Sequence, residues 1–451
     1  MLDQLALSEQ ESYIRSECIP KVIFLKSFRI VLSVLLLVGA ISEFAAQIDS
    51  SLIQQQFSSE DILNHPPEEE PKVYAAGRIL EDPKELPQTI YIITKEEIIN
   101  GGYFTLVDIL KTLPGFRTSQ PGSALLGETF LMRGLLGNNY TKILINGLPI
   151  KPYGVAGMPL GAQLPIRQAE RIEVILGPSA TLYGSDAVAG VINIVLPKVS
   201  RPVEAGADLT MGMNGTSQMD LSIAGKVGKG DHVIIYNLYG TQRTVADQNI
   251  DTDQFHADSV TQASPFYVGS IANSAIPEIR KLDHVSKLIG GRLIYNGLTI
   301  SANSMFRKDH AALGADPGVI AYHNASSYMA EKIDFYTLQY NKSFSKKWTV
   351  MLNASLLNYE IDDNSSYMGI GHPLSNGNNF IYAKSLDWNV EPIVNFASGK
   401  FNVLLGGKYQ HAAGKNYQGY LQKPDSDDAV FLDPVTGTQL VENSNDAYSS
   451  I

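Results

Sequence analysis

The chain has little of what builds covalent cross-links or helical membrane spans. Its 451 residues include 1 Cys and 2 Trp. Cys18 lies upstream of the first apolar run, so cleavage of that run as a signal leaves no cysteine for disulfides, thiol catalysis or a zinc site. After residue 47, no apolar stretch reaches the ~20 residues that a membrane-spanning helix needs.

Basic residues are also scarce. Lys and Arg total 35 against 46 Asp and Glu, which gives a net charge of -11. An acidic chain without basic clusters argues against nucleic acid as a partner. The sequence contains neither an HExxH pattern nor a Gly-x-Ser-x-Gly elbow, and no Gly-Lys-Ser/Thr follows Gly184. We therefore do not expect an enzyme.

The N-terminal segment has the pattern of a secretory signal. The apolar run Ile30–Ile41 follows a basic flank and precedes small residues that end at Ala46. This pattern predicts a signal peptide with an N-terminal extension over residues 1–46; a buried core helix is the alternative. Residues 47–84 are polar and proline-containing, which predicts a flexible leader.

Residues 85–197 have the alternating helix and strand signals of a mixed α/β domain. Thr94 and Glu97 form a predicted capping box. The pair Asn146-Gly147 predicts a tight hairpin turn. The remaining expected elements are a strand at 89–94, a helix after Thr105 that ends at Pro114-Gly115, a hairpin over 142–150, and strands at 171–176 and 188–196.

From residue 198 to residue 451 the hydrophobic period changes to two. Ile300 and Ala302, for example, alternate with Ser301 and Asn303. Short turns alternate with longer connections, as in outer-membrane barrels. Strands are expected near 201–212, 216–228, 232–243, 285–296, 298–308, 333–344, 348–361, 384–397 and 400–411, with another from 447. These strands alone leave a membrane barrel and a soluble β-protein both open.

A series of short motifs in residues 85–197 occurs in the same order as in a known family. The densest is Glu170-Arg171-Ile172-Glu173-Val174-Ile175-Leu176-Gly177-Pro178, followed by Leu182-Tyr183-Gly184 and Val191-Ile192-Asn193-Ile194. The domain resembles the plug domain of TonB-dependent outer-membrane receptors. The resemblance implies a mixed α/β plug domain followed by an antiparallel transmembrane β-barrel of about 22 strands, of which about ten are present here.

The resemblance also implies a function and a location. Such a receptor lies in the bacterial outer membrane, surrounded by its lipid, and imports an iron-siderophore, a cobalamin or a similar small-molecule metal complex. TonB and its inner-membrane energy-coupling complex supply the energy. The segment Lys72, Val73, Tyr74, Ala75 and Ala76 stands where the family carries its TonB box, which pairs with TonB as an added strand.

Three charged plug residues, Arg133, Arg171 and Glu173, form an expected network that pairs with carboxylates of the barrel wall by analogy with the family. An ordinary surface ion pair of small energetic value is the alternative. The family commonly has Arg or Lys where this chain has Leu176, so the network here is expected to be weaker or differently wired.

Two further sites follow from the resemblance and from composition. The ligand-facing plug apices are expected at Ser119, Gln120, Pro121 and Gly122, and at Tyr153, Gly154, Val155, Ala156, Gly157 and Met158. No resident cofactor is expected except Ca²⁺, for which Asp247, Asp251, Asp253 and Asp258 offer oxygen ligands; a solvated acidic loop is the alternative.

Two other hypotheses remain at this point. The chain is an unfinished gene product if its strands stop near Ser450, because an open sheet leaves unpaired edges in lipid. A secreted β-rich enzyme or adhesin is the third hypothesis, which the plug motifs and the lack of a catalytic constellation disfavour.

Overall fold

The structure is a computed structural model. It describes residues 88–123, 126–179, 183–184, 186–197, 199, 201–213, 215–230, 232–246, 283–310, 328–345, 347–368, 378–398, 401–420, 431–432, 439–440 and 448–450. The chain divides into two compact units, Met1–Glu70 and Pro71–Ile451. All described residues belong to the second unit, and the description below concerns that unit alone. The predicted signal peptide, residues 1–46, and the predicted leader, residues 47–84, lie outside the described residues.

Residues 88–197, called here the N-terminal domain, are built on a 5-stranded sheet with the order β1-β7-β8-β5-β6. Only β5 and β8 are paired in parallel. The strands are β1 (Thr89–Thr94), β5 (Thr141–Ile145), β6 (Leu148–Pro149), β7 (Arg171–Leu176) and β8 (Gly190–Val195). A second, 3-stranded sheet contains β2 (Phe116–Ser123), β3 (Gly127–Met132) and β4 (Leu135–Leu136). The helices are α3 (Lys95–Asn100), α4 (Leu106–Leu110) and α5 (Gly137–Tyr140).

Local signals determine where the first two helices begin. The Thr94 side chain accepts from the Glu97 backbone N–H, and the Glu97 carboxylate accepts in return, so the predicted capping box is confirmed. Thr105 and Asp108 form a second capping box at α4. Helix α4 ends at Leu110 and not at Pro114, because the backbone N–H groups of Thr112 and Leu113 bond to carbonyls three residues back, in tighter turns.

The hairpin between β5 and β6 confirms the predicted turn. Asn146 has a φ of 49° and Gly147 a φ of 81°, the two positive values that a two-residue type I′ turn requires. The Asn146 side chain also accepts from the backbone N–H of Leu196, so the turn is tied to the residue that follows β8.

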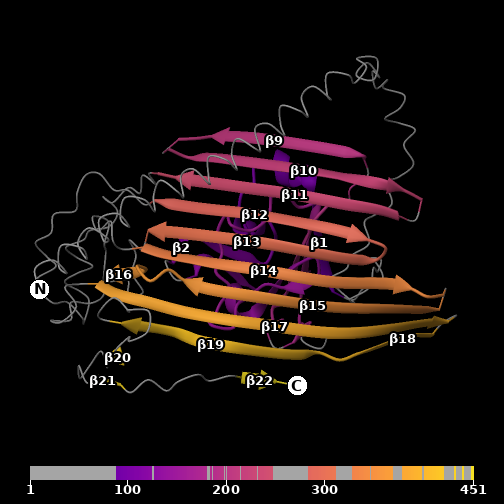
Figure 1. The fold of residues 1–451 in the computed structure, drawn as a ribbon. Helices are drawn as coiled ribbons and strands as arrows, with labels where there is room; N and C mark the ends of the chain where they lie inside the picture. The colour runs from indigo at the N-terminus through magenta and orange to yellow at the C-terminus, as the bar shows by residue number, and fades with distance from the viewer. Residues whose placement is uncertain are drawn as a thin grey trace, which may run out of the picture. The chain divides into compact units, whose positions relative to one another are not determined.

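Residues 203–450 contribute a long antiparallel sheet in the strand order β9-β10-β11-β12-β13-β14-β15-β17-β19-β22 (Figure 1). The bounds are β9 (Val203–Met211), β10 (Ser217–Lys229), β11 (His232–Val245), β12 (His284–Tyr295), β13 (Leu298–His310), β14 (Tyr328–Ser343), β15 (Trp348–Ile361), β17 (Asn378–Ser398), β19 (Tyr409–Tyr420) and β22 (Tyr448–Ser450). The short strand β16 (Ser366–Met368) pairs with β14 and β17, and the short strand β18 (Phe401–Gly406) pairs with β17. Outside this sheet, β20 (Phe431–Leu432) pairs with β21 (Gln439–Leu440). The predicted fold class, a mixed α/β domain followed by antiparallel strands, is confirmed.

The strand prediction is wrong in several places. The strand expected at 400–411 is interrupted after Gly406 and continues to Tyr420, and both of its parts, β18 and β19, pair with the same neighbour, β17. Strands β16, β20 and β21 lie between the expected strands, where the pattern predicts connections. Side-chain alternation is weak around the glycines 406 and 407, so it could not locate this break.

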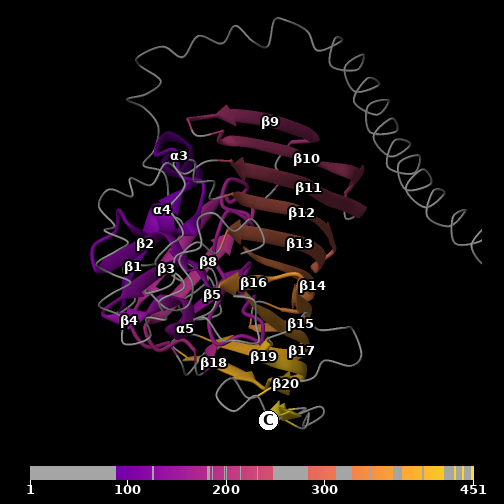
Figure 2. The same cartoon turned by 90° about the vertical axis from the view of Figure 1, so that its left-hand side faces the viewer.

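The two faces of the long sheet differ in the way the alternation predicts. In β13, Ser301 and Asn303 are buried on the inner face, whereas Ile300 is 49% exposed on the other. The N-terminal domain lies against this inner face (Figure 2). Core residues of both parts, including Leu106 and Leu160 on one side and Met305 and Phe335 on the other, form one hydrophobic cluster. Apolar burial therefore holds the domain against the sheet.

Aromatic side chains mark the short-turn end of the long sheet. Tyr295, Phe344 and Trp348 are exposed next to short turns, as interfacial girdles require. Tyr359, which also lies near a strand end, is instead buried on the inner face. Among the described residues, no helix is long and apolar enough to cross a membrane.

Candidate functional site

A polar contact between the N-terminal domain and the inner face is centred on the segment before β7. The Arg167 guanidinium lies 3.4 Å from an Asp208 carboxylate oxygen and 4.0 Å from one of Asp220. Next to it, the Gln168 amide donates to Asp220 at 2.9 Å and to Thr241 at 2.6 Å. The domain thus contacts carboxylates on β9 and β10 through a cation and an amide.

The predicted charge network has a different arrangement. Arg171 forms ion pairs inside the domain, at 2.8 Å with Glu173 and at 3.0 Å with Glu170. Glu173 is fully buried and also accepts from the Asn193 amide at 3.0 Å. Arg133 lies on an exposed turn with a φ of 54°. The structure therefore brings Arg171 and Glu173 together and leaves Arg133 apart from them. The residue that contacts carboxylates of the long sheet is Arg167.

Sequence reasoning did not find Arg167 and Gln168. The one feature of the sequence that could have pointed to these two residues is their position, immediately before the densest family motif and between two apolar segments. Their partners lie 41 to 73 residues further along the chain, so no local spacing reveals the contact.

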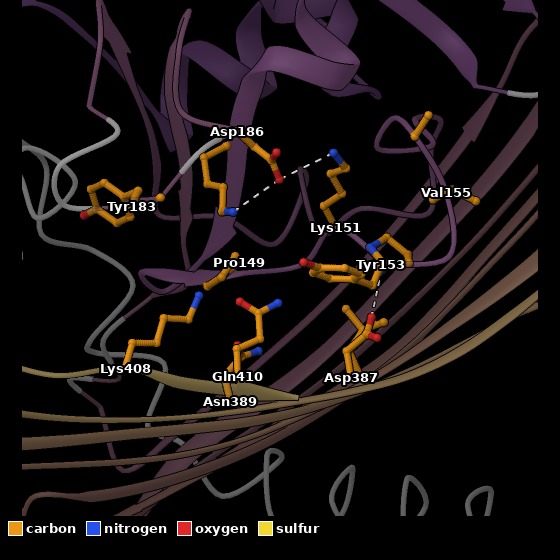
Figure 3. Close-up of a pocket in the computed structure, with 15 residues that line it drawn as sticks. Pro149, Lys151, Tyr153, Val155, Tyr183, Asp186, Asp387, Asn389, Lys408 and Gln410 are labelled. Carbon is orange, nitrogen blue, oxygen red and sulfur yellow. Dashed lines mark hydrogen bonds and ion pairs between the residues drawn. The ribbon is translucent and has the colours of Figure 1, made fainter. Parts of the chain in front are cut away.

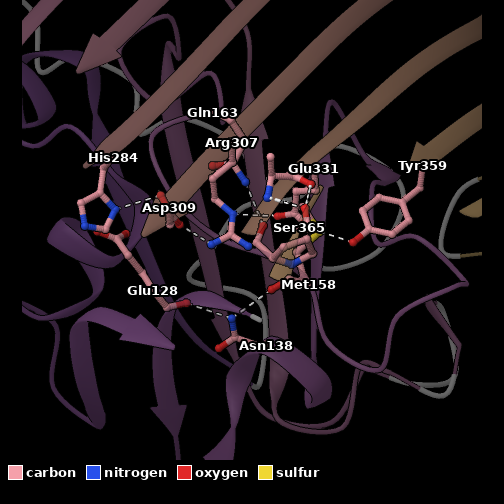
Figure 4. A network of polar contacts seen from close by, with 12 residues as sticks. Glu128, Asn138, Met158, Gln163, His284, Arg307, Asp309, Glu331, Tyr359 and Ser365 are labelled. Atoms are coloured by element: carbon pink, nitrogen blue, oxygen red, sulfur yellow. Dashed lines mark hydrogen bonds and ion pairs between the residues drawn. The ribbon is translucent and has the colours of Figure 1, made fainter. Parts of the chain in front are cut away.

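A chain of polar contacts crosses four neighbouring strands of the inner face (Figure 4). His284 on β12 contacts Asp309 at 2.9 Å, and Asp309 pairs with Arg307 on β13. The Arg307 Nε donates to Glu331 on β14 at 2.7 Å, and Glu331 accepts from the Tyr359 hydroxyl on β15 at 2.7 Å. The buried Arg307 charge thus has two carboxylates beside it on the sheet itself, as a buried cation requires.

Arg307 also packs against the backbone of the N-terminal domain. A Cβ atom placed on Gly127 would lie 2.2 Å from Nη1 of Arg307, and one on Gly161 would lie 3.0 Å from its Cδ. Both glycines therefore allow a close approach that any side chain would block.

A cavity of about 240 Å³ lies beside this network. The N-terminal domain contributes Asp108, Gln120 and Glu128 to its lining, and the long sheet contributes residues near the strand ends that adjoin the longer connections, among them Val245 and His284. In outer-membrane barrels this end faces outward. We call it the outward cavity.

The carboxylates of the outward cavity differ in their environments. The Gln120 amide donates to Asp108 at 3.0 Å and to Glu128 at 2.9 Å. Burial raises the pKa of Glu128 to about 7, although the Gln120 amide opposes this shift. Burial also acts to raise the pKa of Asp108, but hydrogen bonds from Gln120 and from the backbone of Phe104 and Thr105 outweigh it and lower that pKa. Glu128 therefore titrates near neutral pH, whereas Asp108 stays ionised.

A second cavity, of about 500 Å³, lies between the N-terminal domain and strands β17 and β19 (Figure 3). The Tyr153 backbone N–H donates to the Asp387 carboxylate at 2.8 Å. On the domain side, Lys142 and Lys151 each lie 3.4 Å from Asp186. Burial acts to raise the pKa of Asp186, but the two ammonium groups outweigh it and lower that pKa, so the carboxylate is ionised at neutral pH.

The predicted ligand-facing residues fall into three groups. Gln120 lines the outward cavity, and Tyr153, Val155 and Ala156 line the second cavity. Ser119 pairs with a residue of β3 at the same end of the domain, while the side chains of Pro121 and Gly122 lie outside the described residues. Gly154, Gly157 and Met158 are buried, and Met158 belongs to the hydrophobic core, so its predicted exposure to a ligand is wrong.

Two predicted sites lie outside the described residues. They are the TonB-box segment Lys72–Ala76 and the calcium candidates Asp247, Asp251, Asp253 and Asp258. Within the part of the chain that the structure describes, no group of three or more His, Cys, Asp or Glu residues is arranged to hold a metal ion.

Comparison with known proteins identifies the N-terminal domain. A family model described as the TonB-dependent Receptor Plug Domain matches residues 82–191. The chain carries the plug domain of a TonB-dependent receptor. The long sheet is accordingly the wall that faces the plug, and the resemblance read from the sequence is confirmed.

Relatives of known sequence and structure agree with this assignment. The vitamin B12 transporter BtuB of Vibrio vulnificus (strain YJ016) is 35% identical over 156 residues, which are 34% of this chain and 25% of that protein. The ferric yersiniabactin uptake receptor FyuA of Yersinia pestis has a TM-score of 0.55 at 14% identity, over 72% of this chain and 49% of that one. The pyoverdine outer membrane receptor FpvA of Pseudomonas aeruginosa has a TM-score of 0.57 at 14% identity, over 78% and 50%.

The chain therefore spans about half the length of these solved receptors and a quarter of the curated relative. At this identity the solved structures establish the fold alone. The relatives are receptors and a transporter, in agreement with the expectation that the chain is not an enzyme. Receptors with this plug are outer-membrane proteins, which confirms the predicted location.

Proposed function

We propose that the chain acts in the TonB-dependent import of an iron-siderophore, a cobalamin or a similar metal complex across the outer membrane. The observation that carries this proposal is the position of the plug domain against the inner face of the long sheet. The plug lies on an inner face that carries buried polar and apolar side chains, and the other face of this antiparallel sheet is apolar and carries an aromatic girdle. A barrel filled in this way can admit a bulky ligand only if the plug moves.

The plug contacts are compatible with such movement. Arg167 and Gln168 connect the plug to Asp208 and Asp220 through a few polar contacts. Tyr153, Pro197 and Asn146 of the plug contact side chains of the sheet through backbone groups. Arg307 keeps its carboxylate partners on the wall. Displacing the plug therefore does not strip this buried arginine of its counterions, which would cost several kcal/mol.

TonB is the proposed source of the pulling force, through strand pairing with residues 72–76. Backbone hydrogen bonds dominate such pairing, so a proline in this segment removes a donor and disfavours the added strand. We expect Tyr74→Pro to weaken binding of the purified chain to the periplasmic domain of TonB at least tenfold, measured by fluorescence anisotropy.

The matched control is Tyr91→Phe, which changes a tyrosine of β1 without touching the proposed segment. It should leave TonB binding unchanged. Equal affinity of the Tyr74→Pro variant and the unaltered chain would remove the assignment of this segment.

A further inference from the structure

The outward cavity contains a carboxylate whose charge is poorly compensated. Glu128 accepts from Gln120 through Oε1, while its Oε2 is buried and has no hydrogen-bond partner among the described residues. Within the same residues Glu128 makes no ion pair with a cationic side chain. A carboxylate oxygen that is buried without a hydrogen-bond partner is costly when the group is ionised.

The acidic groups close to Glu128 come from both the plug and the long sheet. Asp108 on α4 and Asp309 on β13 are carboxylates, and both raise the pKa of Glu128 further. Asp309 is already paired with Arg307 and His284. Asp108 is paired with Lys111 at 3.2 Å. Neither carboxylate has a cation to share with Glu128.

Arg243 on β11 and His284 on β12 also line the cavity; His284 contacts Asp309, and Arg243 has partners other than Glu128. Its guanidinium lies over the Phe104 ring at 4.5 Å from the centroid and donates to Gln218 at 3.0 Å. Its charge acts on Asp108, Glu128 and Asp220 together. The lining of the outward cavity thus has three carboxylates and one guanidinium, a buried acceptor atom on Glu128, and room for several non-hydrogen atoms, since a water takes about 30 Å³.

From this arrangement we propose that the outward cavity is a subsite for a primary ammonium group, with Glu128 as its counterion. The proposal rests on the proposed import function, because it assigns the subsite to a part of the imported ligand. The ammonium group donates to Glu128 Oε2, and Val245 and Ala162, which also line the cavity, accommodate a short alkyl stem. Ligands with a pendant amine are thereby favoured over purely anionic complexes, which the carboxylates repel.

The test uses n-butylammonium as the probe and the complete chain in detergent micelles at pH 8, with binding followed by saturation-transfer NMR. Butyrate and butyramide are the comparison probes. We expect n-butylammonium to bind, butyramide to bind at least tenfold more weakly, and butyrate not to bind. At pH 6 the affinity for n-butylammonium should fall about tenfold, because Glu128 must then lose a proton before it can pair.

Two variants separate the subsite from general effects on folding. Glu128→Gln should weaken n-butylammonium binding at least tenfold, whereas Glu360→Gln, which alters an exposed carboxylate paired with Lys384, should not change it. Ser286→Leu keeps Glu128 but fills the outward cavity from the wall, and it should also abolish binding.

Equal binding of n-butylammonium and butyramide, or full affinity in Glu128→Gln, would overturn the subsite. So would absence of n-butylammonium binding by a chain that still binds TonB through residues 72–76, and this result would leave the import function standing. Loss of TonB binding by the unaltered chain would count against the import function instead.

Discussion

Arg171→Met offers the sharpest energetic test of the plug interior. The Arg171 guanidinium lies 2.8 Å from Glu173, and the exposed fractions of the two side chains are 11% and 0%. Removing the cation leaves a buried carboxylate with the Asn193 amide as a remaining hydrogen-bond donor. Breaking a buried pair in this way costs about 3–5 kcal/mol. Each 1.4 kcal/mol is about a factor of ten, so opening of the plug sheet should become roughly a hundred- to several-thousand-fold more frequent.

Hydrogen exchange followed by mass spectrometry measures this opening directly in peptides that cover β7 and β8. The matched variant, Arg171→Met with Glu173→Met, replaces both charges by apolar side chains of similar length. It should recover at least 2 kcal/mol relative to the single variant, because no buried carboxylate is then left without its cation, even though the Asn193 hydrogen bond and the ion pair between Arg171 and Glu170 are also lost. Exchange in Arg171→Met within threefold of the unaltered chain would refute the view that Glu173 depends on Arg171.

Other perturbations test the plug contacts and the predicted calcium site. Gly161→Ala inserts a methyl group 3.0 Å from Arg307 and should destabilise the docked plug by about 1–3 kcal/mol in urea unfolding, whereas Gly407→Ala, with open space around its Cβ, should change little. The raised pKa of Glu128 means that the folded state binds its proton more tightly than the unfolded state. The contribution of Glu128 to the free energy of unfolding should therefore be largest below pH 4.5 and decline by about 3 kcal/mol as the pH rises through 7. The Glu128→Gln variant should not show this decline. If Asp251 and Asp253 bind Ca²⁺, Asp251→Asn combined with Asp253→Asn should abolish any rise in melting temperature with added Ca²⁺; a melting temperature that never responds to a chelator argues for the solvated loop.

Local chemistry made the elements of the plug predictable from the sequence. The capping box of Thr94 and Glu97 and the turn at Asn146-Gly147 depend on residues within a few positions of each other, and both are present. The alternation of polar and apolar residues likewise predicted which face of β13 is buried. These features need no knowledge of the tertiary structure.

Contacts between distant segments could not be predicted in the same way. The sequence pointed to Arg171 as a partner of the wall, but the short distance between Arg171 and Glu173 on one strand satisfies both charges inside the plug. Arg307 appeared to be an ordinary strand residue, and only the fold shows that two plug glycines make room for it. Met158 was expected at an apex, yet the fold buries its side chain in the core.

The central claim is that the plug rests on the inner face of the wall through the segment that contains Gln168. Cysteines introduced at Gln168 and Thr241, whose side chains are 2.6 Å apart, should be joined by a short bifunctional thiol reagent in isolated outer membranes. The control pair, Gln168 with the outward-facing Leu238, should remain unlinked. Efficient linkage of the first pair alone is the predicted result; linkage of the control pair, or of neither, would contradict the account.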